Sequence, residues 1–252
     1  VLRQMGRGQA VRRIPRRPRR RWGSGEIQLI LDRSRRLAPF AEDFDRTALR
    51  LAALFPSRAV VWALALDGLA TPVRFGQNGT FTEDLVPRPG AIVLLLGDLG
   101  CLDPQSERLV ERWQAFGLRL RAAGCRPFAL TPCPPGRWPR GQLDAWDKLP
   151  LERSIPLVST DREDAMQRLL RLLSPAVRIE PGLVRMMRRL LADAAEAGTE
   201  ADVWNHPAMI GRSREAGTLD PGQARQWREE LAAEDPVLYA RVLTILHAWR
   251  GM

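Results

Sequence analysis

Apolar and polar positions are distributed along the chain in blocks that predict strands alternating with helices. Short apolar runs of strand length cover residues 26–31, 58–66, 91–96, 126–131 and 155–158, with a hairpin partner at 72–75. Apolar positions at helical spacing follow at 39–55, 103–123 and 160–173. Strands separated by helices are typical of an α/β fold of Rossmann-like type, with a mostly parallel sheet and helices on both faces.

From residue 176 onward the pattern contains no strand signal and predicts an all-α helical subdomain. Helices are expected over residues 181–197, 200–210, 221–234 and 236–249. An apolar stripe with Val184, Met187 and Leu191 belongs either to the inside of a bundle or to an open groove for a partner helix. The predicted division of the chain is a leader (1–24), an α/β domain (25–175) and the helical subdomain (176–252).

Two of the predicted strands end at a carboxylate. Residues 26–31 run into Asp32 and Ser34, and residues 91–96 run into Asp98. Because parallel strands deliver side chains to the carboxyl edge of a sheet, these three residues converge if the strands are neighbours. An oxygen-rich cluster of this kind suits Mg²⁺ or Mn²⁺, or a strong hydrogen-bond network.

This arrangement resembles the von Willebrand factor A domain over roughly residues 25–175. The metal-ion-dependent adhesion site of that family begins with Asp-x-Ser-x-Ser after the first strand and is completed by an Asp after a later strand. Asp32 and Ser34 match the first two positions, and Asp98 matches the later aspartate. Arg36 stands at the second serine position. In detail the segment resembles degenerate von Willebrand A-like regions of large bacterial multidomain proteins, some of which also carry sulfatase-modifying-factor-like domains.

The arginine at the second serine position changes what the resemblance implies. In a working adhesion site the cation holds a carboxylate of the partner protein. Arg36 removes one ligand of the cation and brings a permanent positive charge into the cluster. We therefore expect a metal-free or weakly metal-binding site in which Arg36 offsets Asp32 or Asp98. Thr80 and Thr82 are the candidates for the intervening threonine of the family.

Partner recognition is then expected in the loops around the site or in the helical subdomain. The loop 131–140 is rich in proline and leaves a predicted strand at its carboxyl end, so it should lie near the site. Its Trp138 is either a recognition anchor or a lid packed on apolar surface. Trp138 and Arg36 are the residues that we expect a partner to contact.

The positive charge of the chain is concentrated at its start. The net charge is +10, and residues 1–22 hold nine arginines and no acidic residue, so the remainder is close to neutral. A segment so rich in arginine and proline has too few apolar groups to fold alone. It is expected either to attract nucleic acid or an acidic protein face, or to serve as a solvated linker.

Signatures of several enzyme classes do not occur in the sequence. It contains no Gly-x-Ser-x-Gly elbow, no phosphate loop ending in Lys-Ser/Thr and no His-Glu-x-x-His. His206 and His247 have no His or Cys at metal-ligand spacing, which indicates structural histidines. Three cysteines without a Cys-x-x-Cys pair indicate reduced structural thiols, and they are Cys101, Cys125 and Cys133.

The expected function is therefore that of a non-catalytic protein-interaction or scaffolding module with a protein partner and no cofactor. We expect it to belong to a larger bacterial multidomain or multi-component system in the cytoplasm. The alternative is a metal-dependent nuclease or phosphohydrolase that uses Asp32 and Asp98. No apolar run reaches the roughly 20 residues that span a bilayer, so no membrane partner is expected.

Overall fold

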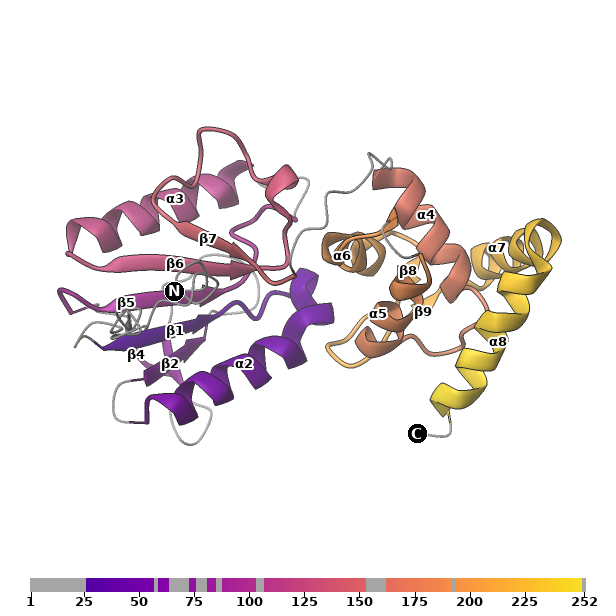
Figure 1. Cartoon of the computed structure of the whole chain (residues 1–252), viewed down its shortest axis with the longest axis horizontal. Coiled ribbons are helices and arrows are strands. Elements are labelled where there is room, and N and C mark those ends of the chain that lie inside the picture. The colour runs from indigo at the N-terminus through magenta and orange to yellow at the C-terminus, as the bar shows by residue number, and fades with distance from the viewer. Residues whose placement is uncertain are drawn as a thin grey trace, which may run out of the picture.

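The structure, a computed structural model, describes residues 26–56, 59–63, 73–75, 81–84, 88–102, 107–152, 162–191 and 194–250. Within these residues, one sheet has the strand order β4-β3-β2-β1-β5-β6-β7. The expected α/β fold is confirmed (Figure 1). The strands are β1 (Ile27–Leu31), β2 (Ala59–Ala63), β3 (Val73–Phe75), β4 (Phe81–Asp84), β5 (Ile92–Leu96), β6 (Arg126–Thr131) and β7 (Asp147–Pro150).

The centre of the sheet is parallel, and β1 lies between β2 and β5. All pairings from β2 through β1, β5 and β6 to β7 are parallel, whereas β3 pairs antiparallel with both β2 and β4. The chain leaves β1 toward β2 on one side and later enters β5 on the other side. The strand order therefore reverses between β1 and β5, which is where open α/β sheets form crevices at their carboxyl edge.

Alternate residues of the central strands face two separate cores. Ile27, Leu29 and Leu31 pack with the 3₁₀ helix η1 (Arg35–Phe40) and with α2 (Ala41–Leu54). Ile30 faces the opposite core, which α3 (Glu107–Ala122) covers. Because strands buried on both faces carry apolar residues at nearly every position, β1 and β5 read as continuous apolar runs in the sequence.

The core under α3 is closed by the loop that precedes β7. Trp146 of this loop donates its indole N–H to the carbonyl of Trp113, with 2.8 Å between the two atoms. A Cβ atom at Gly117 would lie 2.5 Å from the same indole nitrogen, so α3 needs a glycine where it meets Trp146. The indole ring therefore fixes the position of α3 on the sheet.

The helices after β7 gather in a second body beside the carboxyl ends of the strands (Figure 1). Its members are α4 (Arg162–Leu173), α5 (Pro181–Leu190), α6 (Ala197–Asn205), α7 (Pro221–Glu234) and α8 (Pro236–Arg250), with a hairpin of β8 (Met209–Ile210) and β9 (Thr218–Leu219). Val184 and Met187 are fully buried in its core. These two residues of the apolar stripe therefore face the inside of a helical bundle and do not line an open groove for a partner helix. Among the described residues, every helix is too short or too polar to cross a bilayer.

Helix α4 packs with this helical body, although its residues fall within the predicted α/β domain (25–175). Its buried leucines share one core with α5, α6 and α7. The domain limits remain predictions, and the packing favours a boundary before α4. The chain between β7 and α4 includes the predicted strand at 155–158, which lies outside the described residues.

Other differences from the expected elements have local causes. Strand β7 was not predicted because Asp147 and Lys148 interrupt its apolar pattern, as is common in edge strands. The expected helix 181–197 corresponds to two helices, because α5 covers its first part and α6 begins at its last residue. Ala195 and Ala197 are also buried, so the apolar pattern continues past the end of α5 and does not show where that helix stops. The two-residue strands β8 and β9 are too short to give a pattern.

Buried ion pairs connect α5, α6 and the α/β domain. Glu200 of α6 is completely buried and accepts hydrogen bonds from Arg185 and Arg188 of α5. Burial raises the pKa of Glu200 despite these two charges. Arg185 also pairs with Asp43 of α2 and donates to the carbonyl of Pro39, so one arginine holds α5 against both α6 and the sheet domain.

We predict that Val184→Asp destabilises the protein by about 3 to 5 kcal/mol, because it places an unpaired charge in the helical core. Val237→Asp is the matched control, since Val237 is 79% exposed on α8 and the substitution should change stability by less than about 0.5 kcal/mol. Urea unfolding of both variants measures the difference. Equal stability of the two would contradict the bundle assignment.

We also predict that Glu200→Gln lowers the free energy of unfolding by about 3 kcal/mol, because Arg188 then keeps its buried charge with the half-exposed Glu152 as its remaining ionic partner. Glu234→Gln removes a comparable pair with Arg171 on the surface and should cost less than about 1 kcal/mol. Chemical denaturation at neutral pH compares the two. A Glu200 variant as stable as the control would show that the buried pair contributes nothing.

Candidate functional site

The carboxyl edge of the sheet brings Asp32 and Asp98 together where the strand order reverses. Leu31 of β1 is aligned with Leu96 of β5, and the amide of Asp32 donates to the carbonyl of Leu96 at 3.0 Å. Gly97 follows, and a Cβ atom at this position would lie 2.8 Å from the Cβ of Asp32. The missing side chain at Gly97 therefore allows Asp32 to reach the edge.

A tight turn after β5 turns two amides toward Asp98. Leu99 and Gly100 both have positive φ angles, 57° and 84°. Leu99 adopts this left-handed conformation despite its side chain, which is buried in the core under α3. The amides of Gly100 and Leu102 donate to the two carboxylate oxygens of Asp98, at 3.0 Å and 3.1 Å.

Asp32 is held by the residue two positions later. The amide of Ser34 donates to Oδ1 of Asp32 at 3.0 Å, and the hydroxyl of Ser34 donates to the same oxygen. Ser34 therefore uses its hydroxyl within the cluster, in a loop that leads into η1. The convergence of Asp32, Ser34 and Asp98 is as the strand ends predict.

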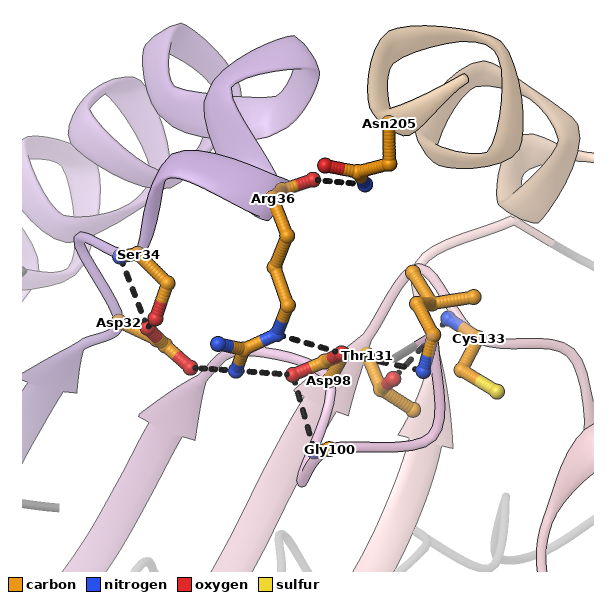
Figure 2. A network of polar contacts seen from close by, with 9 residues as sticks. Asp32, Ser34, Arg36, Asp98, Gly100, Thr131, Cys133 and Asn205 are labelled. Carbon is orange, nitrogen blue, oxygen red and sulfur yellow. Dashed lines mark hydrogen bonds and ion pairs between the residues drawn. The ribbon is translucent and has the colours of Figure 1, made fainter. Parts of the chain in front are cut away.

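Arg36 reaches between the two carboxylates and binds both (Figure 2). Its Nη2 donates to Oδ2 of Asp32 at 2.9 Å and to Oδ1 of Asp98 at 2.8 Å. Its Nε donates to Oδ2 of Asp98 at 3.2 Å. The guanidinium thus makes a forked contact with Asp98 and a single contact with Asp32, a geometry that lysine could not reproduce.

Burial makes the charges of this cluster strongly dependent on one another. Asp98 is inaccessible to solvent and Asp32 is nearly so. Burial raises the pKa of Asp32, and the nearby Asp98 adds to the shift, although Arg36 and Ser34 oppose it. Burial acts on Asp98 in the same direction, but Arg36 and the two turn amides outweigh it and lower the pKa of Asp98. Asp98 is therefore the firmly ionised partner of Arg36.

The residues present do not fit a divalent cation between the two carboxylates while Arg36 keeps this position. Each carboxylate oxygen of Asp32 and Asp98 accepts at least one hydrogen bond from the chain itself. The permanent charge of the guanidinium stands where a cation would have to bind. Among the described residues, no group of three or more His, Cys, Asp or Glu side chains is arranged to hold a metal.

Two residues that are not among the predicted site residues complete the surroundings of the cluster. Thr131 ends β6, the strand beside β5, and its hydroxyl accepts from the amide of Cys133 at 3.0 Å. Asn205 at the end of α6 donates to the carbonyl of Arg36 at 3.3 Å (Figure 2). Thr131 could have been found as the next strand end along the edge. Asn205 gives no sequence signal, because its role depends on how α6 packs.

The other candidate residues that the structure describes do not join the cluster. Trp138 donates its indole N–H to the carbonyl of Cys133 at 3.0 Å, and its half-buried ring packs on the core under α2, so it lies as a lid. Thr80 lies outside the described residues, and Thr82 belongs to β4, which β3 and β2 separate from β1. The ring nitrogen Nδ1 of His206 accepts from the amide of Ala208, consistent with a structural histidine.

The chemistry of this arrangement is that of a structural charge cluster. A hydrogen bond with Cys101, together with burial, raises the pKa of the nearby Cys133 thiol, so Cys133 is not an activated nucleophile. Burial lowers the pKa of His206, and this side chain is held at the end of α6 rather than at the cluster. The cluster itself has its donors and acceptors matched to one another, which suits positioning of backbone more than proton transfer.

We predict that Arg36→Gln destabilises the protein by about 3 to 5 kcal/mol at pH 7, because two buried carboxylates lose their shared cation. Without the charge that lowers both pKa values, the folded carboxylates should titrate above their unfolded values near 4. A raised folded pKa adds stability as the pH falls, so the deficit should shrink between pH 7 and pH 5.

Urea unfolding of wild type and Arg36→Gln at the two pH values measures this deficit. Arg46→Gln is the control, since Arg46 forms an exposed pair with Glu42 and should cost less than about 1 kcal/mol. A deficit that is the same at pH 5 and pH 7 would show that carboxylate repulsion is not its cause.

Comparisons of this chain with protein-family models, with curated proteins and with solved structures found no match. The family resemblance therefore rests on Asp32, Ser34 and Asp98 and on the order of the elements around them.

Proposed function

We propose that the chain is a non-catalytic protein-interaction or scaffolding module built on a degenerate von Willebrand A-like domain. The observation that carries this proposal is the guanidinium of Arg36 between Asp32 and Asp98. In the resembled family this position belongs to a cation that holds a partner's carboxylate. Here the guanidinium of Arg36 takes the place of that cation. Because it is covalently part of the chain, it cannot dissociate as a bound metal ion can.

The burial of the cluster supports the proposal. The side chain of Arg36 is only 14% exposed, and Asp32 and Asp98 are less exposed still. A partner that approached the carboxyl edge would meet α6, which packs on η1 and holds the carbonyl of Arg36 through Asn205. Recognition of a protein partner therefore falls to the outer surfaces of the domain and of the helical body. Membership of a larger bacterial system is part of the same proposal.

The catalytic alternative requires the cluster to open. A nuclease or phosphohydrolase with Asp32 and Asp98 as ligands would have to displace Arg36 and gain further carboxylates, since two-metal chemistry needs several oxygen ligands. Attraction of nucleic acid by the arginine-rich leader needs no such change, because it depends on charge alone. We therefore propose binding without cleavage if nucleic acid is a partner.

The test is the effect of divalent cations on thermal stability. A functional Mg²⁺ site would stabilise the fold by about 1.4 to 2.7 kcal/mol when the ion exceeds its Kd ten- to a hundredfold. We predict that the melting temperature of wild type is the same in EDTA and in millimolar Mg²⁺ or Mn²⁺. Arg36→Ser, which restores the family's serine, should be less stable than wild type in EDTA and should regain part of that stability with Mg²⁺.

Asp98→Asn is the matched variant, because it removes a cation ligand and the main partner of Arg36 while keeping the size of the side chain. It should be destabilised equally with and without Mg²⁺. A rise of several degrees for wild type that disappears in Asp98→Asn would overturn the proposal and indicate a working cation site. Cleavage of DNA or RNA under the same conditions would favour the nuclease.

A further inference from the structure

A groove with a cavity volume of about 820 Å³ lies between η1 and the β8–β9 hairpin of the helical body. Four arginines line it, and no acidic residue does. Two of them, Arg33 and Arg35, come from the loop that leaves β1 and from the start of η1. The other two, Arg212 and Arg214, come from the hairpin loop. The groove is thus built by both parts of the chain and is charged from both sides.

Alternate residues of the loop after β1 belong to two different sites. Asp32, Ser34 and Arg36 belong to the buried charge cluster, whereas Arg33 and Arg35 line the groove. Asp32 and Asp98 bind Arg36 within the cluster, whereas Arg33 and Arg35 present their charges on the side of the groove. Asn205 connects the groove lining to the cluster through its hydrogen bond to the carbonyl of Arg36.

One carboxylate, that of Asp45, holds two of the groove arginines. Asp45 of α2 binds Arg33 through both of its oxygens and contacts Arg214 at 3.3 Å. Arg33 is thereby fixed in place, since only 15% of its side chain is exposed. Arg35 and Arg212 are exposed to solvent, and Arg212 donates to the carbonyl of Trp204 at 2.9 Å through one nitrogen. One aspartate against four arginines leaves the groove with an excess of positive charge.

The side chains that line the groove indicate which kind of anion would bind there. Guanidinium groups bind phosphate oxygens in a forked geometry, and several of them around one concave site suit a ligand with more than one phosphate charge. The volume is in the range of sites for small molecules. The aromatic residue of the lining, Trp204, is 1% exposed, so a nucleic-acid base would find no ring on which to stack.

We propose that this groove binds a small phosphate-bearing ligand, an inorganic or organic oligophosphate, through Arg35, Arg212 and Arg214. Arg33, held by Asp45, lines the same groove as a fixed side chain. Such a ligand would contact η1 and the hairpin at the same time and would hold the helical body against the sheet domain. This proposal does not depend on the scaffolding function, because it is argued from the groove arginines and not from the carboxylate cluster.

The experiment is isothermal titration of the full chain with inorganic pyrophosphate in the presence of EDTA. Wild type is compared with Arg35→Gln, with the double variant Arg212→Gln/Arg214→Gln, and with Arg241→Gln, an exposed arginine of α8 that lies outside the groove lining. All four proteins carry the same arginine-rich leader, so its contribution cancels. Melting curves confirm that each variant is folded.

We expect the double variant to raise the Kd for pyrophosphate about tenfold or more, Arg35→Gln to raise it by a smaller factor, and Arg241→Gln to leave it unchanged. A nucleoside triphosphate should show the same dependence on the groove arginines. Tighter binding of this nucleotide would identify an organic phosphate as the ligand, and equal binding would indicate recognition of the phosphates alone.

Three outcomes would overturn the proposal. An equal Kd for all four proteins, or no binding of pyrophosphate by wild type, would show that the groove has no affinity for phosphate. Binding of an acidic peptide that is lost in the double variant, while pyrophosphate does not bind, would assign the groove to a protein partner instead.

Discussion

The contact of one guanidinium with two buried carboxylates, at the point where the sheet reverses its strand order, determines the surroundings of the carboxyl edge. Taking Asp32 and Asp98 out of water is costly, and their proximity adds repulsion. Arg36 offsets both effects, and the amides of the turn after β5 bind the remaining lone pairs of Asp98. The arrangement also depends on two local features. The left-handed conformation of Leu99 shapes the turn after β5, and the missing side chain at Gly97 leaves room for Asp32.

The same contact explains why the helical body can cover the edge. A cation site that serves a partner must leave a coordination position open to solvent, whereas a cluster closed by its own arginine can be buried. Helix α6 lies over it and adds Asn205, and the ion pairs of Arg185 with Asp43 and Glu200 hold the neighbouring helix in position. Separating the members of such a buried pair leaves an uncompensated charge, which disfavours other arrangements of these helices. The two parts of the chain therefore meet in a defined way.

The sequence predicts the parts of the site that depend on strand ends and leaves out those that depend on packing. Apolar runs ending at Asp32 and Asp98 predict that the two residues converge if their strands are neighbours, and the pairing of β1 with β5 meets that condition. The contribution of Asn205 could not be predicted, since it depends on the docking of α6. Helix α4 has the pattern of any amphipathic helix, and only its neighbours decide that it packs on α5, α6 and α7. Strand β7 is too polar to show an apolar run.

The positions of the two aspartates along the chain have a consequence for folding. Asp32 lies four residues before Arg36, within the same loop, whereas Asp98 lies 62 residues after it. The first contact can form locally and costs little loop-closure entropy, but the second forms only when β5 has paired with β1. Until then Asp98 is an isolated charge that resists burial. Completion of the cluster is thus tied to the assembly of the central strands, and Asn205, 169 residues from Arg36, can join only after the helical body has reached the sheet.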